Sequence, residues 1–333
     1  MNKMLHNLFI VKTPLQVINS IEAVHSFNLQ NNILILVENK EKLYTQMKNL
    51  SDLIEWKEII YFKTENGFKD MLNSISLLKK LNILKFDNIF FSRFGTIQRL
   101  LVANTIKNNV YYIDDGVETI TIYNNILIPN TINKLNFRQL SRFRYLLFGL
   151  KIDIKDNINL FTYFNLKPLK NSKIVPNRLE YFQKKYMNKA ILDKKVYILG
   201  QPLVERGFVT EELYIEYIKY IIKDSKYDVI YIPHIGEKNN SAIYKIKNEN
   251  FTITDIDLPI ELYFLQKSIF PIKIISFFTT AFFTLKFLYP KSQFESLYIE
   301  NNLILKRNKI VQEQYEYIEN FGINLIKMEN NEI

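Results

Sequence analysis

Short apolar runs typical of buried β-strands alternate with segments of helical periodicity along the 333-residue sequence. In the first part, strands are predicted at residues 7–11, 32–37, 59–62, 88–91 and 110–113, and the clearest helices at 68–81 and 97–106. The first strand leads into a helix through Thr13, a good N-cap residue, and Pro14, which suits the first helical turn. Strands that alternate with helices indicate a parallel sheet with helices on both faces.

The same alternation starts again after a polar stretch, which predicts a second α/β domain. Its strands are predicted at 196–199, 228–232, 251–253, 272–278 and 297–299, and its helices at 211–222, 257–266, 279–288 and 311–321. We expect an N-terminal Rossmann-like, acceptor-side domain over residues 1–155, an irregular linker over 156–190 and a C-terminal Rossmann-like domain over 191–333. Two such halves facing each other imply a central cleft lined by turns at strand ends.

Residues 126–150 form a basic and aromatic segment that we predict to be helical. Its expected role is an amphipathic cover helix on the first domain, and its surface could also contact a membrane or an acceptor.

The net charge of +10 favours anionic partners such as nucleotide phosphates, sugar phosphates or acidic lipid headgroups. Part of this excess follows from a composition rich in Ile, Asn and Lys and poor in Gly, which is typical of AT-rich coding. The basic residues are spread along the chain without a nucleic-acid-binding motif, so nucleic acid is not an expected partner. With no cysteine and only three histidines, the chain has no thiolate chemistry and too few ligands for a histidine-built metal site.

Other common signatures are absent from the sequence. No P-loop, dinucleotide-binding fingerprint or nucleophile elbow occurs, so ATP hydrolysis, nicotinamide binding and α/β-hydrolase chemistry lack support. Asp255 and Asp257 have the Asp-X-Asp spacing of some metal-dependent sugar transferases, but the alternation around them is typical of a strand edge. The apolar stretch 274–285 is shorter than the ~20 residues of a membrane span, and the N-terminus shows no cleavage site. We expect a cytoplasmic protein, alternatively one peripheral to the inner face of the cytoplasmic membrane.

A histidine stands where a buried strand of the second domain ends. His234 follows Pro233 directly after the apolar run 228–232, and ligands of open α/β sheets bind outside the carboxyl ends of strands. An imidazole there is well placed to meet a phosphate or a reacting hydroxyl. A loop histidine held by one hydrogen bond is the alternative interpretation.

Two carboxylates follow a strand of the first domain. Asp114 and Asp115 come directly after residues 110–113, and Gly116 lets the backbone turn. Burial and mutual repulsion raise the pKa of such carboxylates, which would suit a general base. An ordinary Asp-Gly turn is the alternative.

Hydroxyl residues mark another strand end in the second domain. Ser276, Thr279 and Thr280 lie where a strand passes into a helix, and helix N–H groups with threonine hydroxyls can bind an anion. Plain N-capping is the alternative. Glu261 follows Pro259 at another helix start, where it could accept hydrogen bonds from a ribose diol or simply stabilise the first turn.

Taken together, these motifs resemble the bacterial sialyltransferases of glycosyltransferase family 52, which include lipooligosaccharide α-2,3-sialyltransferases. The resemblance covers nearly the whole chain in the family's order. It rests on residues 7–10 with Thr13, Leu15 and Gln16, on 114–116, on Gly200-Gln201-Pro202, on 233–234 and on 277–281. Bacterial polysialyltransferases share the paired acids followed by Gly and the histidine motif.

This resemblance implies an α/β fold of GT-B type and a CMP-activated sialic acid bound mainly by the second domain. His234 matches the family histidine that contacts the donor phosphate, although Ile235 stands where the family usually has proline. Thr279 and Thr280 match a hydroxyl position that holds the same phosphate. Further substrate contacts are expected from the other residues of the matching motifs and their neighbours: Thr13, Gln16, Gly116, Gly200, Gln201, Pro233, Glu261 and Ser276.

The resemblance leaves two candidates for the catalytic base. Asp115, beside Asp114, matches the acidic motif used by polysialyltransferases and is ranked first. Some family members place an acid directly after the Gly-X-Pro turn, where this chain has Leu203, with Glu205 nearby as the second candidate.

The expected activity is metal-independent, inverting transfer of sialic acid from CMP-sialic acid to a galactose-type hydroxyl of a lipooligosaccharide or capsule glycan, without a cofactor. A homodimer and contact with an anionic membrane are compatible with this expectation. Alternatives are a related transferase that uses CMP-Kdo or a nucleotide hexose, a polysialyltransferase-like enzyme, and a non-enzymatic basic binding protein.

Overall fold

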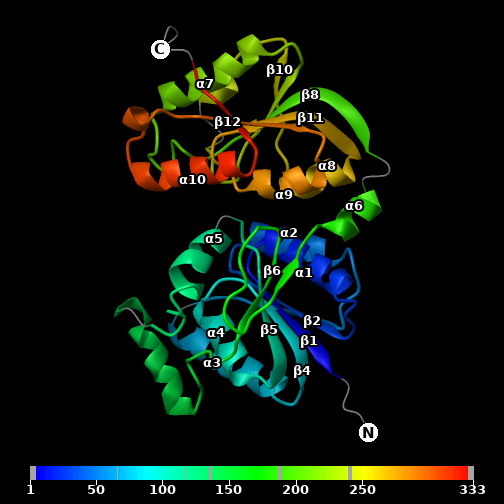
Figure 1. The fold of residues 1–333 in the computed structure, drawn as a ribbon, viewed down its shortest axis with the longest axis vertical. Coiled ribbons are helices and arrows are strands. Elements are labelled where there is room, and N and C mark those ends of the chain that lie inside the picture. The colour runs from blue at the N-terminus through cyan, green and yellow to red at the C-terminus, as the bar shows by residue number, and fades with distance from the viewer. Residues whose placement is uncertain are drawn as a thin grey trace. The chain divides into compact units, whose positions relative to one another are not determined.

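The computed structural model describes residues 5–65, 67–116, 118–134, 137–186, 190–238 and 242–328, with the backbone alone for 137–142. The chain divides into two compact units, Met1–Tyr181 and Phe182–Ile333. Each unit is built on its own parallel sheet (Figure 1), so the predicted α/β class with two domains is confirmed.

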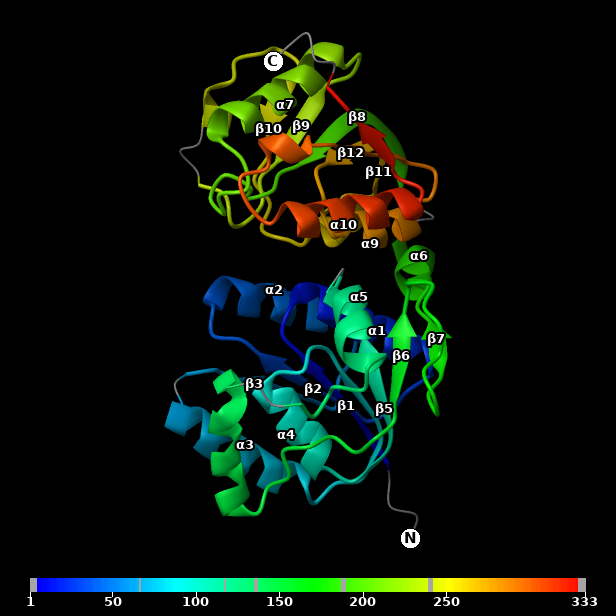
Figure 2. The same ribbon diagram turned by 60° about the vertical axis from the view of Figure 1, so that its left-hand side comes forward.

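The first unit contains a seven-stranded sheet in the order β3-β2-β1-β4-β5-β6-β7, with every neighbouring pair parallel. The strands are β1 (His6–Val11), β2 (Asn32–Val37), β3 (Glu58–Phe62), β4 (Phe86–Phe91), β5 (Lys107–Ile113), β6 (Ile158–Thr162) and β7 (Ile174–Pro176). Helices α1 (Pro14–Ser26) and α2 (Glu41–Ser51) cover one face, and α3 (Gly67–Leu81) and α4 (Thr96–Asn104) cover the other (Figures 1 and 2). The strand order reverses between β1 and β4, which is where ligands bind in doubly wound sheets.

Local sequence explains the start of α1 and the packing beneath it. Thr13 is the N-cap, and its hydroxyl accepts a hydrogen bond from the Gln16 N–H at 3.4 Å, as the sequence predicts. Phe9, Phe90 and Tyr111 lie in register on β1, β4 and β5, and their rings stack at centroid distances of 4.6 and 5.0 Å. This aromatic row fills the core beside β1, β4 and β5.

A row of asparagine side chains crosses the same strands near their amino ends. Asn7 donates to Asn32 at 3.2 Å, Asn88 donates to Asn7 at 2.9 Å, and Asn109 donates to Asn88 at 3.2 Å. The four residues are directly paired across β2, β1, β4 and β5. Each amide satisfies its neighbour, so this amide ladder ties four strands together in one register.

The segment predicted as a linker belongs to the first unit, which corrects the boundary at residue 155. Residues 158–162 form β6 beside β5, with Leu160 and Phe161 fully buried, and residues 174–176 add β7. Strand β6 was not predicted because its short apolar run has polar residues on both sides in the sequence. Helix α6 (Glu180–Tyr186) follows it.

Residues 126–150 do not form the single helix that we predicted. Helix α5 (Glu118–Ile122) continues as a π-helix at Tyr123–Leu127, and a 3₁₀ helix follows at Phe137–Phe148. The interruption follows from Pro129, which has no N–H to donate and clashes with the preceding turn.

The second unit contains a six-stranded parallel sheet in the order β10-β9-β8-β11-β12-β13. Its strands are β8 (Ile191–Leu199), β9 (Val229–Ile232), β10 (Phe251–Ile253), β11 (Ile269–Ser276), β12 (Gln293–Leu297) and β13 (Asn324–Ile326). Helix α7 (Glu211–Asp224) covers one face, and α8 (Ile260–Gln266), α9 (Ala281–Leu288) and α10 (Asn308–Asn320) cover the other (Figure 1). The order reverses between β8 and β11, as it does between β1 and β4.

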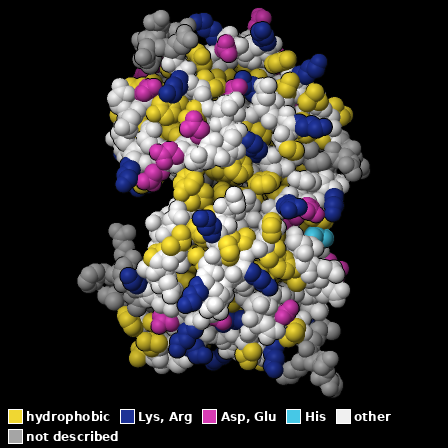
Figure 3. All heavy atoms as spheres, in the orientation of Figure 1, with side chains coloured by type: hydrophobic (Ala, Val, Ile, Leu, Met, Phe, Trp, Pro, Cys, Tyr) yellow, Lys and Arg dark blue, Asp and Glu magenta, His cyan; other side chains and the backbone are white. Residues whose placement is uncertain are grey.

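Several boundaries differ from those predicted. Helix α8 begins only at Ile260, because Pro259 disfavours helical geometry in the residue before it. The last predicted strand, at 297–299, lies at 293–297, and both α2 and the edge strand β13 were missed. Among the described residues, no helix is both long and apolar enough to cross a membrane. Basic side chains are spread over the visible surface (Figure 3).

Candidate functional site

In the first unit, the predicted acidic motif lies at the carboxyl edge of the sheet. Strand β5 ends at Ile113, and Gly116 adopts a φ of 63°, a left-handed conformation that favours glycine. Asp115 follows β5 and forms an ion pair with Arg93, which follows the neighbouring strand β4. The Thr13 hydroxyl, from the turn after β1, donates to Asp115 at 3.3 Å. Three adjacent strand ends therefore converge on one carboxylate.

Arg93 was not among the predicted site residues. Its signal in the sequence is its position directly after a buried strand, but the pairing with Asp115 becomes visible only once β4 and β5 are known to be neighbours. The Asp115 side chain is 5% exposed and the Arg93 side chain 46% exposed, so the arginine is the accessible member of the pair.

Asp114 is fully buried, which argues against direct contact with a substrate, and its catalytic role stays a prediction. Its carboxylate accepts the N–H of Tyr163 at 2.8 Å, and its backbone carbonyl accepts the Asn19 amide at 2.9 Å. Burial raises the pKa of Asp114 to about 7, with a smaller contribution from the charge of Asp115, although the Thr162 hydroxyl and the Tyr163 N–H oppose the rise. The residue joins β5, α1 and the end of β6.

Gln16 is also completely buried, which argues against the direct substrate contact that we predicted. Its side-chain oxygen accepts the Lys12 N–H at 2.7 Å and so closes the turn between β1 and α1. Thr13, in contrast, is only partly buried and stays available at the edge of the sheet.

In the second unit, His234 is exposed in the turn after β9. Its Nδ1 accepts the Gly236 N–H at 2.9 Å, which leaves Nε2 as the protonated nitrogen of the neutral ring. Partial desolvation and the positive charge of Arg206 lower the pKa of His234, and the charge of Glu205 opposes this effect. A neutral imidazole that carries its proton on Nε2 can donate a hydrogen bond to an anion.

Glu237 holds the histidine turn in place and was not predicted. Its carboxylate accepts the His234 N–H at 2.7 Å and the Tyr231 hydroxyl at 2.5 Å. Tyr231 lies 3.0 Å from the hydroxyl of Tyr214, which in turn accepts the Gln201 N–H at 2.9 Å. Burial raises the pKa of Glu237 to about 7. These contacts join the turn after β9 to the turn after β8, and the position of an acid three residues beyond the histidine was the available signal.

Gly200 is required because two polar groups approach its backbone closely. A methyl group added there would collide with the Glu237 carboxylate and with the Tyr231 hydroxyl. The glycine of the Gly200-Gln201-Pro202 turn therefore makes room for the polar chain beneath it.

A pocket of about 370 Å³ opens beside this chain of contacts, and it lies entirely within the second unit. The side-chain oxygen of Gln201 is buried there without a hydrogen-bond partner among the described residues. Glu205 accepts the Lys238 N–H at 2.9 Å. The lining contains acids, an amide and a phenol: Gln201, Val204, Glu205, Glu211, Tyr214, Glu237, Lys238 and Ile243. Such groups suit hydroxyl and amino groups of a ligand.

The predicted hydroxyl cluster after β11 divides into buried and accessible members. Ser276 is fully buried and donates to the Leu199 carbonyl at 2.6 Å, so it joins β11 to β8. This internal role argues against the substrate contact that we predicted. Thr279 accepts the Ala281 N–H at 3.3 Å at the start of α9, and Thr280 is exposed. Both threonines lie at the same sheet edge as Gly200, because β11 pairs with β8.

Glu261 points into the interior, where it accepts the Thr284 hydroxyl at 2.7 Å. Burial raises its pKa. The structure therefore gives this acid an internal partner, and its contact with a ribose stays a prediction. Pro233 is partly buried before His234.

No protein-family model matches the chain. A curated relative, the periplasmic chaperone PpiD of Buchnera aphidicola subsp. Schizaphis graminum (strain Sg), is 30% identical over 261 residues, or 73% of this chain. The chain spans 39% of the length of that relative, and no family membership follows from the match.

Solved structures are similar over nearly the whole chain. The UDP-GlcNAc 2-epimerase of Methanocaldococcus jannaschii is similar with a TM-score of 0.53 and 13% identity, covering 99% of this chain and 90% of that one. The chain has a GT-B fold. A structure of the same enzyme in complex with UDP-GlcNAc and UDP gives a TM-score of 0.51 at 13% identity and the same coverage. At these identities the similarity concerns the fold alone.

Proposed function

We propose that this protein is an inverting glycosyltransferase that moves sialic acid from CMP-sialic acid to a galactose-type hydroxyl of a lipooligosaccharide or capsule glycan. The observation that carries the proposal is His234, an exposed residue in the turn after β9 of a GT-B chain, whose Nδ1 accepts the Gly236 N–H and whose Nε2 is thereby left as the donor. The motif order described for the sequence supports CMP-sialic acid as the donor. UDP-GlcNAc is the competing donor, since the similar Methanocaldococcus structure contains it.

The second unit offers complementary groups for the two halves of a nucleoside monophosphate. His234 and the threonines at the start of α9 would receive the phosphate, where N–H and hydroxyl donors meet the positive end of a helix. The acids and the unpartnered Gln201 oxygen of the pocket would accept hydrogen bonds from the ribose hydroxyls and the cytosine amino group.

For the base, we rank Glu205 ahead of Asp115, which reverses the order favoured by the sequence. The Asp115 side chain is 5% exposed, and its carboxylate already contacts Arg93 and accepts the Thr13 hydroxyl, which leaves little access for an acceptor hydroxyl. Glu205 lines the pocket in the same unit as His234 and influences its charge state.

The reaction that we propose is a single displacement. The acceptor oxygen attacks the anomeric carbon while the bond from that carbon to the CMP phosphate breaks, and the hydroxyl proton passes to the carboxylate. Negative charge grows on the departing phosphate, where His234 and the start of α9 provide hydrogen-bond donors already in position.

One assay tests this proposal: CMP release from CMP-sialic acid with lactose as acceptor, with and without EDTA. We expect turnover that requires lactose and persists with EDTA. Parallel reactions with CMP-Kdo, UDP-glucose and UDP-GlcNAc identify the donor. Turnover with a UDP-sugar but not with CMP-sialic acid would assign a different donor, and loss of activity in EDTA would refute metal independence.

The two candidate bases are separated by Glu205→Gln and Asp115→Asn in the same assay. If Glu205 is the base, its variant loses about 10²–10⁴-fold in turnover. Asp115→Asn should then retain most activity. The opposite result would restore Asp115 as the base.

A further inference from the structure

The 3₁₀ helix Phe137–Phe148 presents large apolar side chains to solvent. Leu147 is 85% exposed, and Phe143, Leu146 and Phe148 are each about half exposed. Phe68 and Leu72, four residues apart on α3, are also exposed, and the first residue of that helix, Gly67, lies against Arg144. Soluble proteins seldom expose large apolar side chains in such a contiguous group without a partner. Figure 3 shows apolar and basic side chains gathered at the lower left of the molecule.

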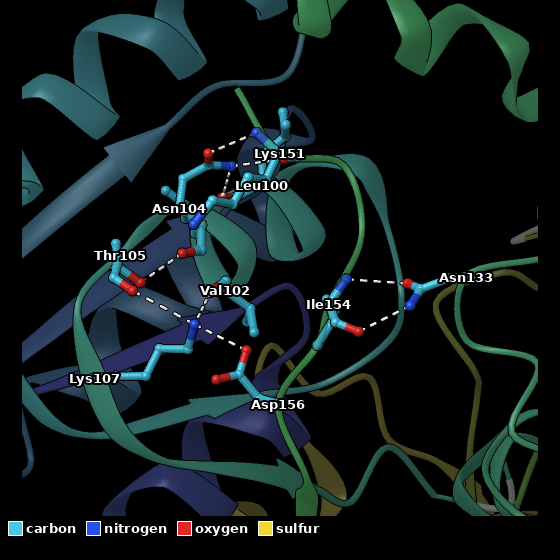
Figure 4. A network of polar contacts seen from close by, with 10 residues as sticks. Leu100, Val102, Asn104, Thr105, Lys107, Asn133, Lys151, Ile154 and Asp156 are labelled. Carbon is cyan, nitrogen blue, oxygen red and sulfur yellow. Dashed lines mark hydrogen bonds and ion pairs between the residues drawn. The ribbon is translucent and has the colours of Figure 1, made fainter. Parts of the chain in front are cut away.

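This exposure is built into the fold, because the segment is anchored on both sides. Tyr145 is 1% exposed and belongs to the core of the first unit. Beyond the helix, Asn104 donates to the Lys151 carbonyl and accepts the Lys151 N–H, both at 2.8 Å (Figure 4). Asn133 makes the same pair of contacts with Ile154, at 2.9 and 3.0 Å (Figure 4).

An ion pair completes this anchor. Lys107 at the start of β5 contacts Asp156 at 2.9 Å and also donates to the Val102 carbonyl (Figure 4). The lysine side chain is 7% exposed, so the pair is shielded from water. The chain that leaves the apolar helix is therefore fixed against α4 and β5, which holds the exposed residues outward.

The charge of this segment is strongly positive. Between residues 134 and 155 the sequence contains a single acid, Asp153, against six basic residues: Lys134, Arg138, Arg142, Arg144, Lys151 and Lys155. Lys134, Lys151 and Lys155 are exposed. Basic residues thus flank the apolar side chains along the chain.

We propose that an apolar-basic face binds the surface of an anionic lipid bilayer. It is formed by exposed residues of this segment and of α3: Phe143, Leu146, Leu147, Phe148, Lys151, Lys155, Phe68 and Leu72. Apolar side chains beside lysines and arginines are typical of segments that lie in the plane of a membrane interface, where the former enter the acyl boundary and the latter meet acidic headgroups. A second copy of the chain is a poorer partner, because two faces of the same positive charge repel. The proposal concerns the first unit alone and does not depend on the reaction assigned above.

Vesicle flotation with the full chain tests this proposal. We expect binding to vesicles that contain phosphatidylglycerol, weaker binding to pure phosphatidylcholine vesicles, and loss of binding as salt is raised. Leu147→Ser should weaken partitioning by about tenfold or more. Leu305→Ser is the matched control, since that leucine is 61% exposed in the second unit.

The charge contribution is tested by the double variant Lys151→Glu/Lys155→Glu, which should weaken binding to anionic vesicles by at least about tenfold. Lys226→Glu/Lys247→Glu changes the net charge equally at exposed lysines of the second unit and should bind like the wild type. Equal loss in both double variants would show that net charge alone is responsible and would overturn the proposal. A Leu147→Ser variant that binds vesicles normally, or that only dissociates a dimer in light scattering, would overturn it as well.

Discussion

At the scale of the single residue, His234 is exposed, and its Nδ1 accepts a backbone N–H, which leaves the proton of the neutral ring on Nε2. We predict that His234→Ala lowers turnover by about 10²–10⁴-fold without unfolding the protein, because a positioned hydrogen-bond donor is lost. CMP-release kinetics and circular dichroism provide the measurement. His25→Ala, at an exposed histidine stacked on Tyr181, should retain activity. Wild-type turnover in His234→Ala would refute the role.

Asp114 gives a pH-dependent prediction. Its pKa of about 7 in the folded protein lies above the ordinary value, so the folded state binds more protons than the unfolded state between about pH 4 and pH 7. Its contribution to the free energy of unfolding therefore falls as pH rises through this window. Asp114→Asn keeps an oxygen for the Tyr163 N–H and should remove about 1–3 kcal/mol of this fall.

Urea denaturation at several pH values measures the effect of Asp114. Asp153→Asn, at an exposed acid, is the control and should follow the wild-type curve. Parallel curves for Asp114→Asn and the wild type would show that the buried acid does not retain its proton.

From the sequence, the position of a residue could be predicted when it depended on the end of a single strand. A contact between residues that follow two different strands could not. The position of His234 after β9 could be predicted from an apolar run that ends in Pro233. The partnership of Asp115 with Arg93 could not, because it requires the strand order. Likewise, Ser276 and Gln16 have suitable chemistry for a ligand, but only the structure shows that both are buried.

The turn after β8 is the element whose shape the second-unit site depends on. We predict that Gly200→Ala destabilises the protein by about 1–3 kcal/mol and weakens CMP binding, since its methyl group would displace Glu237 and Tyr231. Thermal unfolding and calorimetric titration with CMP measure both effects.

Gly95→Ala is the matched control for Gly200→Ala. A methyl group at Gly95 meets only the flexible end of the Gln98 side chain, which can move away. Equal losses of stability and CMP affinity in the two variants would mean that the close contacts of Gly200 with Glu237 and Tyr231 do not determine the shape of this turn.

Among the secondary-structure elements, strands with continuous apolar runs could be predicted. Elements with few apolar residues, or with polar neighbours in sequence, could not. Helix α2 was missed because few of its residues are buried apolar ones, chiefly Met47 and Leu50. Strand β6 was missed because its neighbours in sequence are polar, although β5 buries it in the sheet. Tertiary contacts, which the local pattern does not contain, decide both cases.

For the whole molecule, the carboxyl edges of the two sheets differ in their chemistry: the first unit has the ion pair of Asp115 with Arg93, and the second has His234 and a polar pocket. We predict that nucleotide binding resides in the second unit, so His234→Ala should weaken CMP binding by about tenfold, or ~1.4 kcal/mol, in calorimetric titration. Asp115→Asn, in the first unit, should leave the CMP affinity within about twofold of the wild type. The reverse order would move the donor site to the first unit.

The amide ladder of the first unit has a consequence for which parts of the sheet tolerate substitution. Its hydrogen bonds favour one order and register of the strands, and they lie at the amino edge of the sheet. Asp115, Arg93 and Thr13 lie at the opposite edge. A shift of one strand by one residue would break its asparagine hydrogen bonds and so destabilise the wrong register. The turns at the carboxyl edge are not needed for this selection. We therefore expect the turns after β1, β4 and β5 to tolerate substitutions and insertions without a change in strand order.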